Sequence, residues 1–178
     1  MSTLRLFALT FGLAAQLGSA LAADDGTKAP RLGTPMSASD VVKWDKTVFP
    51  DGRGLPSGHG TAKEGRLLYV QKCASCHGQH GEGATAEDLV GGPKPPSSDN
   101  PSKAIGPYWP FATTIFDFVS RSMPPAAPGS LSADETYAIT AYLLAANRII
   151  GESDEIDAKT LPKVNMPNRD GFIWIDVK

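Results

Sequence analysis

Small and apolar residues recur at three- and four-residue steps after Thr61, which is the spacing of one face of an α-helix. Thr61 and Glu64 also have the spacing of a capping box, in which each side chain accepts a hydrogen bond from a backbone N–H at the start of a helix. The pattern therefore predicts a helix that begins at Thr61. Its stripe holds a glycine, an aromatic ring and two cysteines: Gly65, Leu68, Tyr69, Cys73 and Cys76. The glycine on this stripe indicates close contact with another helix.

A second helix is predicted from Ser132 to about Asn147. Ser132 and Glu135 repeat the capping-box spacing at its start. Small residues and one ring form a narrow face along it: Ala138, Ala141, Tyr142 and Ala145. Such a face allows this helix to cross the surface around Gly65 and Tyr69 at short distance.

Two shorter helices are predicted at Ala112 to Arg121, which carries four large apolar residues, and at Ser39 to Lys43, ending near Trp44. Glycines and prolines make residues 50–60 an irregular, extended path, and residues 78–110 a loop with little periodicity. Nothing upstream of the cysteines alternates like a strand. The predicted fold class is therefore all-α.

The C-terminal part is predicted to be less regular. An acidic stretch after Ile150 is interpreted as a solvated face; it contains Glu152, Asp154, Glu155 and Asp157. The chain closes on Phe172-Ile173-Trp174-Ile175, which we expect to fold back on the domain or to touch a partner.

Residues 1–22 have the features of a secretory signal peptide. Arg5 supplies the positive charge, Leu6 to Leu17 the apolar stretch, and Ala20-Leu21-Ala22 a small-x-small cleavage site. About twelve apolar-rich residues are too few to span a bilayer, which needs about twenty, and no later stretch is long and apolar enough. We expect cleavage near Ala22 and no membrane span afterwards. The remainder divides into an N-terminal leader and extension (23–60), a helical domain (61–148) and a C-terminal extension (149–178).

The composition excludes some partners. The sequence has 17 Lys and Arg against 19 Asp and Glu, a formal charge of −2, and loss of Arg5 with the signal peptide makes it −3. A mildly acidic chain does not favour nucleic acid or an anionic membrane surface. The total charge does not identify a protein partner, because docking depends on the local field.

The chemistry is concentrated in Cys73-Ala74-Ser75-Cys76-His77, which contains both cysteines of the chain. C-x-x-C-H is the attachment pattern of a c-type haem, in which both sulfurs bond to the porphyrin and the adjacent imidazole binds the iron. We therefore predict one covalently bound haem c, attached through Cys73 and Cys76, with His77 as an axial ligand.

Three other interpretations of the same residues are a redox dithiol, a structural zinc site and a disulfide, and each is less consistent with the sequence. A thioredoxin-like dithiol would follow a strand within a βαβ unit. A structural zinc site would need about four ligands, and His59 and His80 do not complete a familiar spacing. A disulfide between Cys73 and Cys76 would close too small a loop to stabilise the fold much.

Met123 is the predicted second axial ligand. It is followed by Pro124 and Pro125 and lies about forty-five residues after His77, so that an extended turn could present its thioether to the iron. Met166 also precedes a proline and is the main alternative, although a methionine is more often core filler. The other methionine of the mature chain is Met36.

The histidines have different predicted roles. The Nδ1–H group of His77 should donate to a backbone carbonyl in the 78–110 loop, which would fix the ring. The sequence does not identify that carbonyl. His59 and His80 are interpreted as surface residues.

The order of capped helix, C-x-x-C-H, long loop, Met-Pro and final helix resembles a class I cytochrome c from about Thr61 to Asn147. Three longer strings resemble the cytochrome subunits of bacterial sulfur-compound dehydrogenases, namely the SoxD-type partner of the molybdenum sulfane dehydrogenase and the sulfite dehydrogenase cytochromes. They are Trp44-Asp45 with Leu55-Pro56-x-Gly58-x-Gly60, Ile105-Gly106-x-Tyr108-Trp109-Pro110-x-Ala112-Thr113-Thr114-x-Phe116-Asp117, and Leu161-Pro162-Lys163-Val164-x-Met166-Pro167-Asn168-Arg169-Asp170-Gly171-Phe172. The resemblance implies the class I cytochrome c fold over residues 61–148, with extensions at both ends.

The resemblance also implies a function. The chain would be a periplasmic electron-transfer protein, not an enzyme on its own, that accepts electrons from a molybdenum-containing sulfur-compound dehydrogenase. It would pass them to a downstream cytochrome c or oxidase. The alternatives are a generic soluble electron shuttle without a dedicated dehydrogenase, and a haem enzyme or gas-binding protein, which would require that Met123 does not bind the iron.

Two features depart from the resemblance. SoxD-type chains often carry a second haem domain, whereas this sequence has one C-x-x-C-H, so we expect a one-haem relative. Asp88 stands before Leu89 where cytochromes of this class often have a proline, which leaves open the carbonyl that faces His77.

Overall fold

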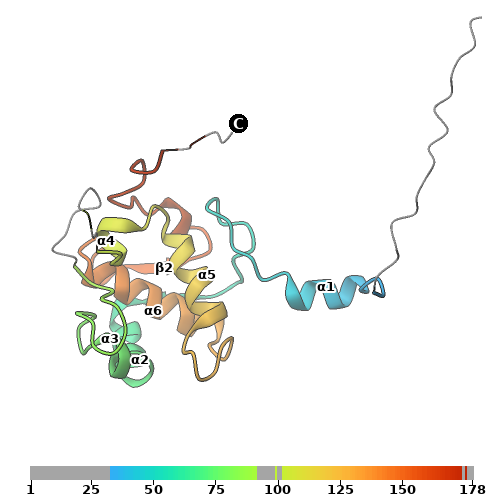
Figure 1. Ribbon diagram of the computed structural model, residues 1–178, viewed down its shortest axis with the longest axis horizontal. Coiled ribbons are helices and arrows are strands. Elements are labelled where there is room, and N and C mark those ends of the chain that lie inside the picture. Colours follow the sequence, from blue (N-terminus) through green and yellow to red (C-terminus); the bar gives the residue numbers. More distant parts are fainter. Residues whose placement is uncertain (1–32, 92–98, 100–101, 174, 176–178) are drawn as a thin grey trace, which may run out of the picture. The chain divides into compact units, whose positions relative to one another are not determined.

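The computed structural model describes residues 33–91, 99, 102–173 and 175 (Figure 1). The predicted signal peptide, most of the leader and Trp174 lie outside these residues. The chain divides into two units, residues 1–37 and Ala38–Lys178, and every described helix and strand belongs to the second. Within the described ranges, no helix combines the length and apolar character needed to cross a membrane.

The second unit is mainly helical, which confirms the all-α fold class. Its elements follow the order α1 (Ala38–Trp44), β1 (His59–Thr61), α2 (Ala62–Lys72), α3 (Ala74–His77), α4 (Ile105–Tyr108), α5 (Ala112–Ser122), α6 (Ala133–Ala146), β2 (Glu155–Asp157) and the 3-10 helix η1 (Leu161–Lys163). The four predicted helices correspond to α1, α2, α5 and α6. Three of them differ from the prediction by about one residue at an end. The predicted helix that carried its stripe to Cys76 instead ends at Lys72, and Cys76 lies in the separate short helix α3.

Both predicted capping boxes are formed. The Glu64 backbone N–H donates to the Thr61 hydroxyl at 3.4 Å, and the Thr61 N–H donates to the Glu64 carboxylate at 3.0 Å. Ser132 and Glu135 make the same pair of bonds at 3.2 and 2.9 Å. The first backbone N–H groups of a helix have no acceptor within the helix, and these bonds supply one. They therefore fix the residues at which α2 and α6 begin.

Helices α2 and α6 cross at Gly65, as predicted. A Cβ added at Gly65 would overlap the Ala138 carbonyl and crowd Cβ of Tyr142, so only glycine permits this approach. Beside the crossing, the rings of Tyr69 and Tyr142 lie 4.9 Å apart. The crossing packs α2 against α6, and α3 follows directly after the end of α2 (Figure 1).

The core lies between α2, α5 and α6. Phe116 of α5 and Tyr137 of α6 are buried with ring centroids 4.5 Å apart, and the Tyr137 hydroxyl donates to the Pro56 carbonyl at 2.9 Å. The C-terminal extension adds further buried residues: Ile156, Leu161 and Met166. Segments before and after the helices therefore help to complete one core.

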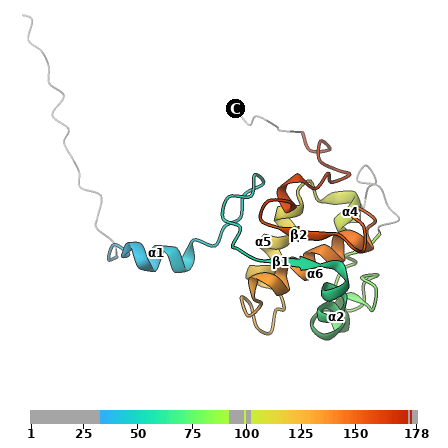
Figure 2. The same ribbon diagram turned by 180° about the vertical axis from the view of Figure 1, so that it is seen from behind.

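Three short elements lie in segments that were predicted to be irregular: β1, β2 and α4. β1 and β2 pair antiparallel, with Gly60 opposite Ile156, and lie side by side in Figure 2. The sequence did not predict them because three residues are too short for an alternating pattern, and the pairing joins segments far apart in the chain. The four-residue helix α4 likewise lies inside the predicted 78–110 loop.

The tail agrees with prediction in part. Glu152, Asp154 and Glu155 are exposed, whereas Asp157 is half-buried and accepts hydrogen bonds from the backbone N–H groups of residues 159 and 160. Phe172 folds back and meets the Tyr108 ring edge-on at 5.6 Å. Ile173 and Ile175 are 89% and 82% exposed, so they do not follow it.

Candidate haem site

An apolar cavity of about 310 Å³ lies between the end of α2, α3, α5, α6 and the loop that follows α3. Its wall includes all four predicted site residues: Cys73, Cys76, His77 and Met123. Most of the remaining wall is apolar, with Leu89, Ile105, Trp109, Ile115, Phe118, Val119, Ile139 and Leu143 among its residues. The structure therefore brings together residues from three separate parts of the sequence around one mainly apolar cavity.

The His77 ring is oriented by the backbone. Its Nδ1 lies 2.8 Å from the Glu87 carbonyl oxygen. Because a carbonyl can only accept, Nδ1 carries the proton and Nε2 keeps its lone pair for a metal. Glu87 is thus the carbonyl that the sequence left open.

The two cysteines are free thiols, which excludes the disulfide interpretation. Burial raises the pKa of Cys73 to about 11, so this thiol stays protonated at neutral pH. A thioredoxin-like dithiol needs the opposite shift and follows a strand, whereas Cys73 follows the C-terminus of α2. Among the described residues, no three His, Cys, Asp or Glu side chains are grouped as a metal site would require, which argues against zinc.

The methionines occupy different environments. Met123 ends α5, and Pro124 and Pro125 after it also line the cavity. Met166 is 1% exposed, packs in the hydrophobic core and is not part of the cavity wall. Met36 is 52% exposed. The geometry favours Met123 over Met166 as the second ligand, and that role stays a prediction.

His59 and His80 are exposed, as predicted, and neither lines this cavity. His59 lies in β1 beside α6, where its backbone N–H donates to the Asp134 carboxylate at 2.9 Å. His80 lies in the loop after α3. The structure brings neither histidine to the site.

One residue that holds the site together escaped the sequence analysis. Asn147, just after α6, accepts hydrogen bonds from the N–H groups of Gly91 and Gly106 at 3.1 and 3.2 Å, and its amide donates to the carbonyls of Leu89 and Leu143 at 3.1 and 2.8 Å. The bonds to Leu89 and Gly91 tie the end of α6 to the loop that carries the Glu87 carbonyl, the bond to Gly106 ties it to α4, and the bond to Leu143 stays within α6. Asparagine is common at the ends of helices, so the sequence does not indicate that Asn147 bonds to the loop.

Tyr69 anchors the start of the same loop. Its hydroxyl donates to the Gly78 carbonyl at 3.0 Å, one residue after His77. Burial raises the pKa of Tyr69 well above its usual value, so the hydroxyl keeps its proton and stays a donor. Asn147 and Tyr69 therefore hold the loop on both sides of Glu87.

These residues fit a covalently bound haem. Two thiols at the required spacing, an imidazole with a free Nε2 and a thioether share the wall of an apolar cavity. Sulfur and imidazole donors are the ligands that c-type haems use.

Comparisons with known proteins agree with this chemistry. Residues 60–143 match the family described as cytochrome c oxidase, cbb3-type, subunit III. The chain is 32% identical over 130 residues to the thiosulfate dehydrogenase of Stutzerimonas stutzeri; the match covers 62% of this chain and 41% of that protein. The chain thus spans about two fifths of that relative's length.

A solved structure covers more of the chain. The crystal structure of the sulfane dehydrogenase SoxCD from Paracoccus pantotrophus superposes with a TM-score of 0.76 at 38% sequence identity, and covers 83% of this chain and 73% of that one. This family implies a haem c cofactor and a role in electron transfer. The chain belongs to the class I cytochromes c, and it is similar to proteins that act in sulfur oxidation.

Proposed function

We propose that this chain is a periplasmic one-haem cytochrome c that accepts electrons from a molybdenum-containing sulfur-compound dehydrogenase, such as a sulfite or sulfane dehydrogenase. It passes them to a downstream cytochrome c or oxidase. The observation that carries the proposal is the single cavity whose wall holds Cys73, Cys76, His77 and Met123. A haem bound there supplies one-electron redox chemistry at its iron.

Each site residue has a defined part in this proposal. Cys73 and Cys76 would hold the group covalently, and the Glu87 carbonyl holds the His77 ring at Nδ1, which leaves Nε2 to bind the metal. Met123 would supply the second axial ligand. With both axial positions taken by side chains, no position would be left for a substrate, so the chain would be an electron-transfer subunit and not an enzyme on its own.

Part of the cavity wall is exposed. Cys76 is exposed, and Phe118, which lines the cavity, is 45% exposed. A partner that docks over these residues would lie close to the bound group, whereas the α6 side is closed by Ile139 and Leu143, which are 1% and 2% exposed. We therefore assign electron entry to the face around Cys76 and Phe118.

The partner assignment is supported by the names of the similar proteins. One is a thiosulfate dehydrogenase and the other a sulfane dehydrogenase, so both act on sulfur compounds. Oxidation of a sulfur compound by two electrons exceeds what one single-electron centre can store. This chain would be reoxidised between the two transfers, or two copies would serve one partner.

The export step rests on residues 1–22, whose pattern is that of a secretory signal. The periplasm is the compartment in which haem is attached to C-x-x-C-H and into which such a signal directs a chain. The proposed location follows from these two requirements together.

The test is stopped-flow mixing of the purified oxidised protein with periplasmic extract from its source, with sulfite, with thiosulfate or with no donor. Fast reduction by one sulfur donor is expected, and it would also name the substrate class. Equal reduction with and without every donor would leave a generic electron shuttle and refute the dehydrogenase partner.

A further inference from the structure

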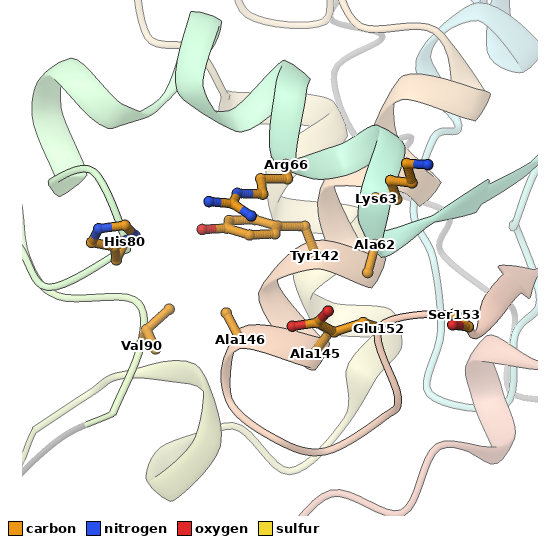
Figure 3. A pocket seen from close by; sticks show the side chains of 10 residues that line it. All are labelled: Ala62, Lys63, Arg66, His80, Val90, Tyr142, Ala145, Ala146, Glu152 and Ser153. Carbon is orange, nitrogen blue, oxygen red and sulfur yellow. The ribbon is translucent and has the colours of Figure 1, made fainter.

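A second cavity, of about 420 Å³, lies on another face of the same two helices (Figure 3). Helix α2 contributes Arg66 to its wall and α6 contributes Tyr142. The loop after α3 contributes His80, and the segment after α6 contributes Glu152. None of these four residues lines the first cavity.

Three hydrogen-bond donors converge in this cavity. The Arg66 side chain extends along the Tyr142 ring, so that its guanidinium lies beside the ring's hydroxyl, and the His80 ring faces both from across the opening (Figure 3). The guanidinium, the hydroxyl and the imidazole thus present N–H and O–H groups to one small volume.

These donors are not used elsewhere. Among the described residues, Arg66 forms no ion pair, and no hydrogen bond is made by its guanidinium, the Tyr142 hydroxyl or the His80 ring. Glu152 lines the same cavity, yet Arg66 does not pair with it. Unpaired donors on an aromatic wall are what a planar or tetrahedral oxyanion requires.

The surrounding charges are mixed. Lys63 also lines the cavity, but its ammonium points away from Arg66 (Figure 3). The Glu82 carboxylate lies near His80 and already accepts the His80 backbone N–H at 2.6 Å. Because Glu152 opposes an anion, binding here would depend on the directed donors of Arg66, His80 and Tyr142 more than on net charge.

We propose that Arg66, His80 and Tyr142 form a binding site for a small oxyanion, separate from the haem cavity. The proposal goes beyond the electron-transfer function and does not depend on it, because no residue of this site touches the haem cavity. The test uses sulfate as the probe, in isothermal titration calorimetry of the mature holoprotein at constant ionic strength, with chloride as the control ion.

Three variants make the test specific. Arg66→Gln is expected to weaken sulfate binding about tenfold, the loss of one charge-assisted hydrogen bond. Lys63→Gln removes the same charge from the same helix but should weaken binding less than about twofold, because the Lys63 ammonium points away from Arg66 and its field is screened by salt. Glu152→Gln should strengthen binding about twofold, because it removes a like charge.

The outcomes distinguish a specific binding site from non-specific attraction of anions to positive charge. Saturable sulfate binding with opposite effects of Arg66→Gln and Glu152→Gln supports the proposal, and a general loss of folding could not produce the gain. No saturable binding in the wild-type protein, equal binding of chloride, or equal losses in Arg66→Gln and Lys63→Gln would overturn it.

Discussion

The two faces of the α2–α6 pair differ in chemistry although they share the same helices. One face is apolar, encloses the haem cavity and is lined by Tyr69, Ile139 and Leu143. The other is more polar, with Arg66 and Tyr142 in the wall of its cavity. Helical periodicity separates them, because residues three or four apart share a face and their neighbours turn away. Both cavities therefore depend on the same helix crossing at Gly65.

The largest effect is expected where both faces depend on the same contact. Gly65→Val should lower the free energy of unfolding by about 3 kcal/mol, because the new side chain overlaps the Ala138 carbonyl and forces the helices apart. Chemical denaturation measures this change. Gln71→Val, at an exposed position of the same helix, is the control and should change it by less than about 0.5 kcal/mol. Equal stability of the two variants would refute the close crossing.

Substitutions at Met123, which is half-buried, and at Met166, which is buried, should distinguish binding of the iron from packing in the core. Met123→Ala in the holoprotein should allow carbon monoxide to bind the reduced iron, because it removes the predicted axial ligand from the cavity wall. Met166→Ala should instead lower the free energy of unfolding by about 2 to 3 kcal/mol, at the low end for core deletions, and carbon monoxide should still not bind the iron. Absorbance spectra under carbon monoxide distinguish them. Carbon monoxide binding to the wild-type protein would favour a haem enzyme or gas-binding protein.

Much of the site and fold could be predicted because the signals are local. The capping boxes at Thr61 and Ser132 and the C-x-x-C-H string each lie within five residues, so a single stretch of sequence specifies them. The Glu87 carbonyl could not be predicted, since every residue offers a carbonyl and only the folded loop selects one. The pairing of β1 with β2 could not be predicted either, because it joins distant segments. Nor could the presence of His80 and Arg66 in the wall of one cavity.

Loosening the loop should have a smaller effect that is confined to the haem side. Asn147→Ala removes four hydrogen bonds and should lower the free energy of unfolding by about 2 kcal/mol. It should also shift the NMR resonance of the His77 Nδ1 proton, because the Glu87 carbonyl loses its support. Tyr137→Phe removes the distant bond to Pro56 and serves as the control. An unchanged His77 resonance would show that Asn147 does not position the ring.

The smallest effect concerns acid stability. The Ser132 backbone N–H, and next Lys72, hold the pKa of Glu135 below its usual 4.5. A pKa lowered by folding means that the carboxylate stabilises the protein above 4.5, and that this contribution is lost as pH falls through the folded-state value. Glu135→Gln should therefore be less stable than wild type at pH 7, by about 0.5 kcal/mol. The difference should vanish in strong acid. Urea titrations across this pH range measure it, and a pH-independent difference would contradict the assignment.

The central claim is that Cys73 and Cys76 hold one haem in the apolar cavity of this chain. Intact-mass spectrometry of the protein, purified from the periplasm of a host that attaches haem to C-x-x-C-H, tests it most directly. The account predicts the mass of the chain cleaved near Ala22 plus one covalently bound haem, and the mass of the chain alone for the Cys73→Ala, Cys76→Ala double variant. A wild-type mass without haem, with both thiols free, would contradict the claim.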